Sequence, residues 1–158
     1  VEGVIGIDYG YSNDPTAVVL TFRQNDKLYI HELLFRKGMT NSDIVDFLKS
    51  NGYGQVICYA DSAEPKSIEE MRRLGMFIKP AVKGQGSINA GISLLKEYDV
   101  IVSKESQNIL REYHNYYWEE LKDGTIINKP QDKENHTMDS IRYAVYSRFG
   151  KRENFFVI

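Results

Sequence analysis

Two aspartates each follow directly on an apolar run of the sequence. Asp8 ends the segment GVIGID, and Asp61 ends the segment QVICYAD. Apolar runs of this length are typical of buried strands, and a charge at the end of such a strand is costly to bury unless a partner neutralises it. If the two strands are parallel neighbours, both carboxylates emerge at one edge of the sheet, where open α/β folds bind their ligands. We therefore expect a binding or catalytic site at that edge.

A third acid comes from the last helical pattern, HTMDSIRYAVYSRF, at residues 136–149. The apolar stripe of this segment contains Met138, Ile141, Val145 and Phe149. Asp139 is about one position out of phase with the stripe, so we expect it on the flank that faces the end of the sheet. All three carboxylates can then reach one point.

Three carboxylates at one point repel each other and raise each other's pKa unless a divalent cation neutralises them. Oxygen ligands alone select hard ions, Mg²⁺ or Mn²⁺. Two such ions, roughly 3.5 to 4 Å apart, would clamp the attacking and leaving oxygens of an in-line phosphoryl transfer. We expect Asp8 to bridge both ions, and Asp61 and Asp139 to hold one ion each.

Each acid also has a simpler structural explanation. An Asp after a strand is often a turn residue, and Asp61 could cap the helix that follows it. Asp139 lies near the start of its helix, where the helix dipole favours an acid. Only the three acids together indicate a metal site.

The elements that must hold these acids can be read from the sequence. Tight turns between three strand patterns predict an antiparallel meander over 3–8, 16–24 and 27–35. Further strands are predicted at 55–61, 76–82 and 99–103, and helices at 40–54, 62–75, 88–98, 104–116 and 136–149. Residues 117–130, YWEELKDGTIINKP, predict a hairpin because a Lys-Asp-Gly-Thr turn joins two strand-like pieces.

This order of elements predicts an α/β fold. We expect a mixed sheet of three antiparallel strands followed by parallel strands, flanked by helices, with an added hairpin before the last helix. Three antiparallel strands followed by a helix and a parallel strand is the order of a ribonuclease H-like sheet. The length of 158 residues, with 42% apolar and 27% charged residues, suits a single globular domain, residues 1–158.

Composition excludes some classes of protein. No segment approaches the roughly 18 to 20 apolar residues of a membrane span. The formal net charge of −2 gives no global positive field for nucleic acid, although local basic patches are compatible with it. The single cysteine, Cys58, fits a reduced cytoplasm. The start at VEGVIGID, without a Met, indicates a domain taken from a longer chain.

Four segments resemble a known family: GIDYGYSNDPTAVV, YADSAEPKSIEEMRRLG, KGQGSINAGISLL and NHTMDSIRYAVYS. From about residue 3 to residue 148, and in the same order, they resemble the C-terminal nuclease domain of tailed-bacteriophage terminase large subunits. That domain is ribonuclease H-like and uses three acids with Mg²⁺ or Mn²⁺ to cut concatemeric viral DNA at packaging. The resemblance implies that Asp8, Asp61 and Asp139 are these acids. One departure is Ser140, where the family often has Ala.

The resemblance also implies a function and partners. It implies an endodeoxyribonuclease that cuts double-stranded DNA by two-metal phosphodiester hydrolysis, in the cytoplasm of the infected bacterial host. The implied partners are an upstream ATPase domain, the terminase small subunit and the portal. The chain contains no GxxxxGK[ST] motif, so it is not itself the packaging ATPase.

Three further residues are candidates for the site. His136 precedes Asp139 by three positions, so both project from one face of the helix, and a neutral imidazole there could bind metal or shuttle a proton. The resemblance supports a histidine at this place. Lys83, in the Gly-rich segment VKGQGS, could meet DNA phosphates or could equally be a solvent-exposed turn lysine. Lys79 could also contact DNA, although its position favours a solvated strand end.

Three other protein classes share some of these features. An actin-like or Hsp70-like ATPase also begins GIDYG, but it needs a second lobe and a chain nearly twice as long. A Holliday-junction resolvase shares the sheet and the acids, and only the KGQGS and hairpin segments argue against it. A non-catalytic DNA-docking module predicts that the acids tolerate replacement. The last two alternatives stay open on the sequence alone.

Overall fold

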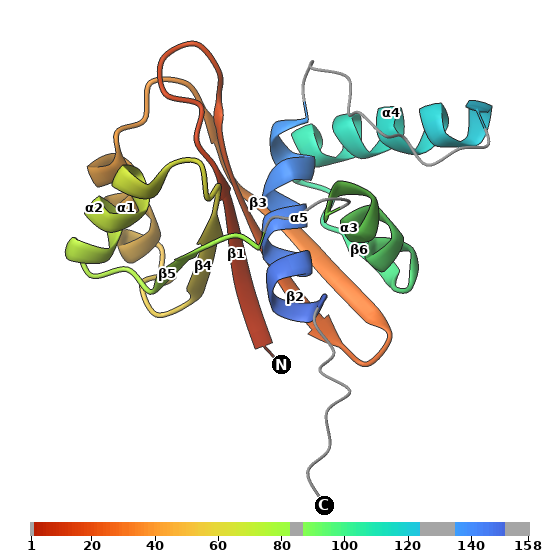
Figure 1. Ribbon diagram of the computed structural model, residues 1–158, viewed down its shortest axis with the longest axis horizontal. Coiled ribbons are helices and arrows are strands. Elements are labelled where there is room, and N and C mark those ends of the chain that lie inside the picture. The colour runs from red at the N-terminus through yellow and green to blue at the C-terminus, as the bar shows by residue number, and fades with distance from the viewer. Residues whose placement is uncertain (1, 83–86, 124–134, 151–158) are drawn as a thin grey trace, which may run out of the picture.

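The computed structural model describes residues 2–82, 87–123 and 135–150. Within these residues, six strands form one sheet and five helices pack on it (Figure 1). The strands are β1 (Glu2–Asp8), β2 (Thr16–Gln24), β3 (Lys27–Arg36), β4 (Ile57–Ala60), β5 (Ile78–Pro80) and β6 (Asp99–Val102). The helices are α1 (Asn41–Ser50), α2 (Pro65–Arg73), α3 (Ser87–Lys96), α4 (Gln107–Asp123) and α5 (His136–Phe149).

The sheet is mixed, with the strand order β5-β4-β1-β2-β3-β6. Strands β1, β2 and β3 form the expected antiparallel meander. Strand β4 pairs in parallel with β1, β5 in parallel with β4, and β6 in parallel with β3. The parallel pairing of the two acid-terminated strands, β1 and β4, is thereby confirmed.

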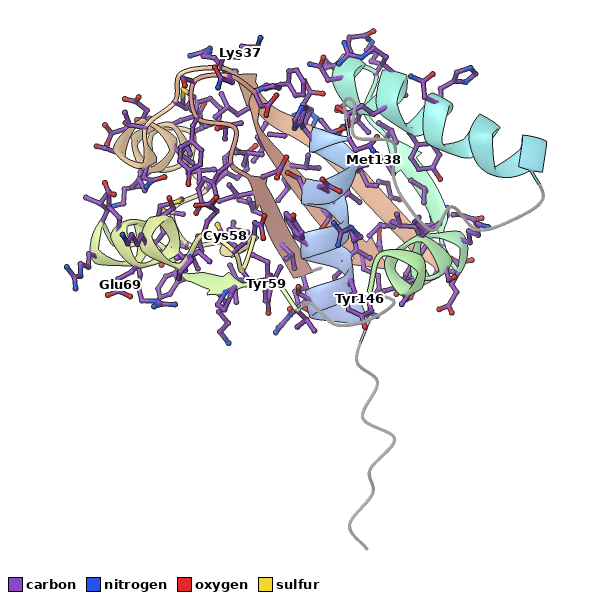
Figure 2. All side chains as sticks on the ribbon, turned by 45° about the horizontal axis from the view of Figure 1, so that its top comes forward. Lys37, Cys58, Tyr59, Glu69, Met138 and Tyr146 are labelled. Carbon is purple, nitrogen blue, oxygen red and sulfur yellow. The ribbon has the colours of Figure 1, made fainter. Side chains whose placement is uncertain are left out.

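Helices cover both faces of the sheet and create two apolar cores. Helices α1 and α2 pack on one face, and α3, α4 and α5 lie together on the other (Figure 1). Neighbouring residues on a strand point to opposite faces. Cys58 and Tyr59 on β4, both labelled in Figure 2, accordingly belong to different cores.

Helix α5 is the most deeply packed helix around the predicted site. Its expected apolar stripe is confirmed, because Met138, Ile141, Val145 and Phe149 are all buried. Tyr143 and Ala144 are buried as well, since α3 and α4 pack beside α5 on the same face of the sheet. Figure 2 shows α5 running from Met138 near one end to Tyr146 near the other.

A close approach of backbones seats α5 on the sheet. A Cβ atom built at Gly6 of β1 would overlap the carbonyl oxygen of Ser140 on α5. The hydroxyl of Ser140, a fully buried residue, donates a hydrogen bond to the carbonyl of Ala17 on β2 at 2.7 Å. Only glycine fits at position 6, and a serine at position 140 fits because its hydroxyl has an acceptor.

Two expectations for α4 were wrong. The helix continues through Asp123, so residues 117–123 are helical where the first strand of a hairpin was expected. Its residues Glu119, Glu120, Leu121 and Lys122 are good helix formers, and this preference prevailed over the turn signal. Residues 124–130, the rest of that expected hairpin, lie outside the described residues. The helix also begins at Gln107, not at residue 104 as expected. The hydroxyl of Ser103, just before the expected start, is hydrogen-bonded to His31 at 2.6 Å instead.

No helix in the described part of the chain is long and apolar enough to cross a membrane.

Candidate active site

The first two acids lie side by side at the ends of parallel strands. Asp8 ends β1, and Asp61 directly follows β4. The register pairs Ile7 with Ala60, so the two aspartates are the next residues of the two strands. Strand β1 lies inside the sheet and has helices on both faces. The Asp8 side chain is therefore only 14% exposed.

The start of α5 brings two more predicted residues to this edge. Nδ1 of His136 lies 3.2 Å from Oδ2 of Asp8. The imidazole ring also meets the ring of Phe35 edge-on, with 6.3 Å between the centroids. Asp139 follows in the first turn of α5, where its Oδ1 accepts a hydrogen bond from Nη2 of Arg142 at 3.1 Å. Strand β1 and helix α5 thus supply three of the predicted residues.

The charges at this edge interact with each other. Burial raises the pKa of Asp8 to about 6; the hydrogen bond from His136 opposes this shift, and the negative charges of Asp139 and Asp61 add to it. Burial also raises the pKa of Asp139, against the opposing effect of Arg142. The hydrogen bond to Asp8 raises the pKa of His136. The buried acids therefore hold their negative charges at a cost in free energy.

The hydrogen bonds of Asp61 show whether it caps the helix that follows it. Its Oδ1 accepts the N–H of Ala63 at 2.9 Å, and its carbonyl accepts the N–H of Glu64 at 3.0 Å. The N-cap of α2 is Glu64, three residues further along the chain. Asp61 therefore orders the turn before α2 rather than capping the helix, and this role is compatible with a metal ligand.

The loop after Asp8 is tied to the helix after Asp61. Tyr11, in this loop, has φ of 55°, a left-handed conformation that is unfavourable for a tyrosine. Its hydroxyl donates a hydrogen bond to Oε2 of Glu64 at 2.7 Å and shares one with Ser67 at 2.9 Å. These bonds connect the two segments that follow the acids, so they restrict how far the strand ends can separate.

The chemistry of the three acids fits a hard divalent cation, because all their side-chain donors are oxygens. Within the described residues, however, no three His, Cys, Asp or Glu side chains form a ready-made cation site. Asp8 is engaged with His136, and Asp139 with Arg142. The three carboxylates share an electrostatic field, and a cation would have to draw them together.

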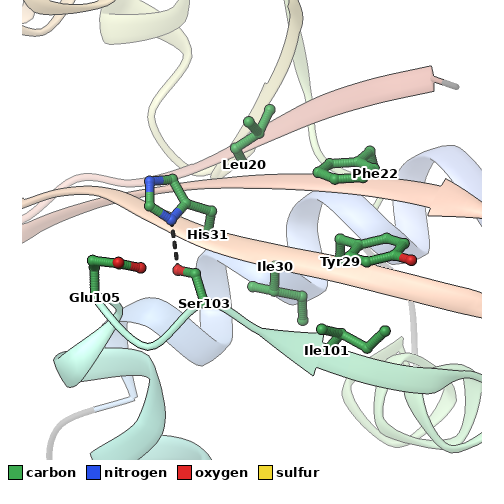
Figure 3. A pocket seen from close by; sticks show the side chains of 8 residues that line it. All are labelled: Leu20, Phe22, Tyr29, Ile30, His31, Ile101, Ser103 and Glu105. Atoms are coloured by element: carbon green, nitrogen blue, oxygen red, sulfur yellow. Dashed lines mark hydrogen bonds between the residues drawn. The ribbon is translucent and has the colours of Figure 1, made fainter.

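The predicted lysines have different outcomes. Lys79 is exposed on the edge strand β5, opposite Tyr59 of β4. Its contact with DNA remains a prediction. Lys83 lies outside the described residues. A pocket of about 360 Å³ contains none of the predicted site residues (Figure 3). That pocket is lined by Leu20, Phe22, Tyr29, Ile30, His31, Ile101, Ser103 and Glu105.

Two residues near the site were missed in the sequence. Arg142 lies three positions after Asp139, a helical spacing at which opposite charges pair, so the signal was present. Glu112 of α4 is 2% exposed and accepts hydrogen bonds from the first turn of α5. A lone glutamate in a helix is normally exposed, so no local pattern pointed to Glu112.

Most of the chain, residues 8–147, matches the family described as the terminase RNAseH like domain. The chain belongs to this family. It is 34% identical over 145 residues to the terminase large subunit of Bacillus phage SPP1, and 29% identical over 143 residues to the PBSX phage terminase large subunit of Bacillus subtilis (strain 168). The matches cover 88% and 89% of this chain but 34% and 33% of the relatives, so this terminase-family chain spans about a third of their length.

Solved nuclease domains of large terminases have the same fold. The crystal structure of the g2p (large terminase) nuclease domain from bacteriophage SPP1, with bound Mn, superposes with a TM-score of 0.76 and 30% identity, and covers 92% of this chain and 85% of that domain. The P22 large terminase nuclease domain superposes with a TM-score of 0.68 at 16% identity, over 92% and 80% of the two chains. These likenesses confirm the ribonuclease H-like fold predicted from the strand order.

Proposed function

We propose that this terminase-family domain is a metal-dependent DNA endonuclease that cuts concatemeric viral DNA during genome packaging. One observation supports this most. Two partly buried carboxylates, Asp8 and Asp139, lie at one edge of the sheet, and their negative charges and that of Asp61 act on each other. Such a group is costly without cations and useful with them. The SPP1 nuclease domain, which has this fold, was crystallised with Mn.

In this proposal Asp8, Asp61 and Asp139 would hold two Mg²⁺ or Mn²⁺ ions. When bound, the ions would lower the pKa of the attacking water and offset negative charge on the scissile phosphate. His136 accepts the proton of that water, and Asp8 favours this step because it raises the pKa of the imidazole. The water oxygen forms the new bond to phosphorus. The P–O ester bond breaks, the leaving oxygen takes its electron pair and a proton from solvent water, and His136 returns its proton to the solvent.

The proposed substrate is double-stranded DNA, held by its backbone. We propose that Lys79, exposed on β5, and Lys83 contact phosphates, which would place the duplex without reading its sequence. Cleavage would then be weakly sequence-specific and sensitive to salt. An upstream ATPase domain, the small subunit and the portal are the proposed partners in the host cytoplasm, consistent with relatives about three times as long as this chain.

The direct test is nicking of supercoiled plasmid DNA. We expect Mn²⁺ to support nicking, EDTA to stop it, and Asp8→Asn or Asp61→Asn to reduce the rate by about 10²-fold or more, because each removes a charge that stabilises the transition state. Asp46→Asn, which changes an exposed acid on α1, is the matched control and should nick like the wild type. Wild-type rates in both site variants would remove these acids from the site, and a wild-type domain that nicks no DNA with Mn²⁺ would favour the DNA-docking module.

Cleavage of a second substrate distinguishes the proposed enzyme from a Holliday-junction resolvase. A Holliday-junction resolvase prefers a four-way junction to a linear duplex, whereas the proposed enzyme needs no junction. We expect equal or better cleavage of duplex DNA. Strong preference for the junction would move the chain's activity to the resolvase class, although the family match favours a terminase.

A further inference from the structure

Helix α5 begins without a capping side chain of its own. Its N-cap residue, Asn135, makes no side-chain capping hydrogen bond within the described part of the chain. The first N–H groups of a helix have no acceptors within the helix, so a buried helix start needs acceptors from elsewhere. The acceptor here is the carboxylate of Glu112 on α4. Its Oε1 accepts the N–H of Thr137 at 2.9 Å and that of Met138 at 3.3 Å.

The bonded N–H groups lie between the two site residues of α5. Thr137 directly follows His136, and Met138 directly precedes Asp139. The backbone that Glu112 holds is therefore the same turn from which His136 reaches Asp8 and which carries Asp139. A shift of this turn would move both site residues together.

Glu112 is buried, so its use as the cap of α5 costs free energy. The residue is 2% exposed, and its Oε2 has no hydrogen-bond partner among the described residues. A buried carboxylate costs more free energy than a Ser or Thr cap on the helix itself. Thr40 provides such a local cap for α1. Helix start alone does not explain Glu112, whereas control over the position of the turn does.

Glu112 also connects α4, which is anchored to the sheet, with α5, which carries two site residues. Helix α4 is anchored to the sheet by Glu32 of β3, whose Oε1 accepts the N–H of Asn108 at 3.0 Å and that of Ile109 at 3.1 Å. Glu112 lies one turn later on the anchored part of α4. The turn that carries His136 and Asp139 is thereby fixed to a rigid support.

We propose that Glu112 is a positioning residue for DNA cleavage, which holds the first turn of α5 so that His136 and Asp139 meet the metal ions in the correct geometry. The inference rests on the proposed function. Glu112 touches neither the substrate nor the ions, and acts through the N–H groups of Thr137 and Met138. Residues that orient the ligands of a metal site commonly change metal affinity or activity by about 10- to 100-fold when they are removed.

Three variants test this role. Glu112→Ala leaves both N–H groups without their acceptor, and we expect the Mn²⁺ concentration for half-maximal nicking to rise about 10-fold or more. Glu112→Gln keeps the shape and one acceptor oxygen, and should restore most of the Mn²⁺ affinity. Thr40→Ala removes the cap of α1, away from the site, and should lower the Tm without changing the Mn²⁺ requirement.

The measurements are a Mn²⁺ titration of plasmid nicking and the rise in Tm that Mn²⁺ produces. A higher Mn²⁺ requirement in Glu112→Ala but not in Thr40→Ala supports the positioning role. An unchanged requirement in Glu112→Ala, or an equal increase in Thr40→Ala, overturns it. If Glu112→Ala does not fold, Glu112→Leu, which fills the same space without an acceptor oxygen, decides, and a wild-type Mn²⁺ requirement in that variant overturns the role.

The two proposals fail in distinguishable ways. A wild-type domain that nicks no DNA with Mn²⁺ rejects the proposed function. The rise in Tm with Mn²⁺ then decides the positioning role, because it reports metal binding without cleavage. A rise as large in Glu112→Ala as in the wild type overturns that role.

Discussion

The first turns of α1 and α5 both carry an aspartate, but the two turns are built differently. Helix α1 is capped by its own sequence: the hydroxyl of Thr40 accepts the N–H of Asp43 at 3.0 Å, and the carboxylate of Asp43 accepts the N–H of Thr40 at 2.9 Å. Helix α5 is capped by Glu112 of another helix. Hydrogen bonds lower the pKa of the exposed Asp43, whereas burial raises the pKa of Asp139.

This difference separates an acid that stabilises the fold from one that serves a site. Asp43 satisfies the backbone of its own helix, so its charge contributes to stability. Asp139 does not cap its own helix, because Glu112 accepts the N–H groups of the turn. Its carboxylate pairs with Arg142 instead, and its charge acts on Asp8. A helix start capped from outside can therefore present its own acid to a ligand.

The largest expected difference between the two helix starts appears when Asp139 and Asp43 are each replaced in a separate variant. We expect Asp139→Asn to lower the rate of Mn²⁺-dependent nicking by about 10²- to 10³-fold, since it removes a negative charge from the proposed metal site. Asp43→Asn should leave that rate unchanged. The measurement is the initial nicking rate of each variant. Equal nicking rates in the two variants would contradict a role in cleavage that Asp139 has and Asp43 lacks.

The seat of α5 on the sheet should matter next. Gly6→Ala would place a methyl group against the carbonyl of Ser140 and push α5 away from β1, at a cost of about 2–3 kcal/mol in the free energy of unfolding. Gly3→Ala, on the same strand, meets only Leu20 and Val56 at 3.7 and 3.9 Å, and should cost much less. Urea denaturation measures both. Similar losses at the two positions would show that the close approach does not constrain α5.

A pH dependence should follow from the buried acid of β1. The pKa of Asp8 in the folded protein, about 6, is above its ordinary value of 3.8, so the folded state binds more protons between these values and metal-free stability falls as pH rises through this window. The raised pKa of His136 acts in the same direction at higher pH. Asp8→Asn should therefore lose less stability than the wild type between pH 4 and pH 7.5, by on the order of 2 kcal/mol.

Urea denaturation in EDTA at the two pH values measures this effect. Asp43, whose pKa is lowered, has the opposite sign: its contribution is present at neutral pH and lost as pH falls through its folded pKa. A difference between the wild type and Asp8→Asn that is the same at both pH values would contradict the account of Asp8.

The smallest effect is expected at the self-capped helix. Thr40→Ala removes the side-chain acceptor of the α1 capping box and should cost about 1 kcal/mol of stability. Nicking by the folded variant should match the wild type. Thermal unfolding measures the loss of stability, and plasmid nicking measures the cleavage rate. A large loss of cleavage would show that α1 also positions the site.

Local patterns were enough to predict much of this architecture. The pattern at residues 40–54 predicted α1, and the structure places its cap at Thr40, with Gly52 just beyond the last turn at the positive φ of 86° that favours glycine. The acid-terminated strands were predicted because each run and its acid are contiguous. Their parallel pairing was the condition for a shared site at one edge, and the structure shows that it is met.

The parts that could not be predicted depend on contacts between distant segments. Glu112 and Thr137 are 25 positions apart, and nothing within α4 shows that its glutamate turns inward. The first strand of the expected hairpin was wrong because a Lys-Asp-Gly-Thr signal was given more weight than the helix formers before it. Sequence therefore predicted which acids could meet, but not what holds the turn that carries Asp139.

The central claim is that the carboxylates at positions 8, 61 and 139 bind divalent metal together. Anomalous X-ray diffraction from crystals of the domain soaked in Mn²⁺ tests it most directly. We predict Mn²⁺ peaks within bonding distance of oxygens from Asp8, Asp61 and Asp139. Mn²⁺ bound elsewhere, or bound with any of the three carboxylates turned away, would contradict the account.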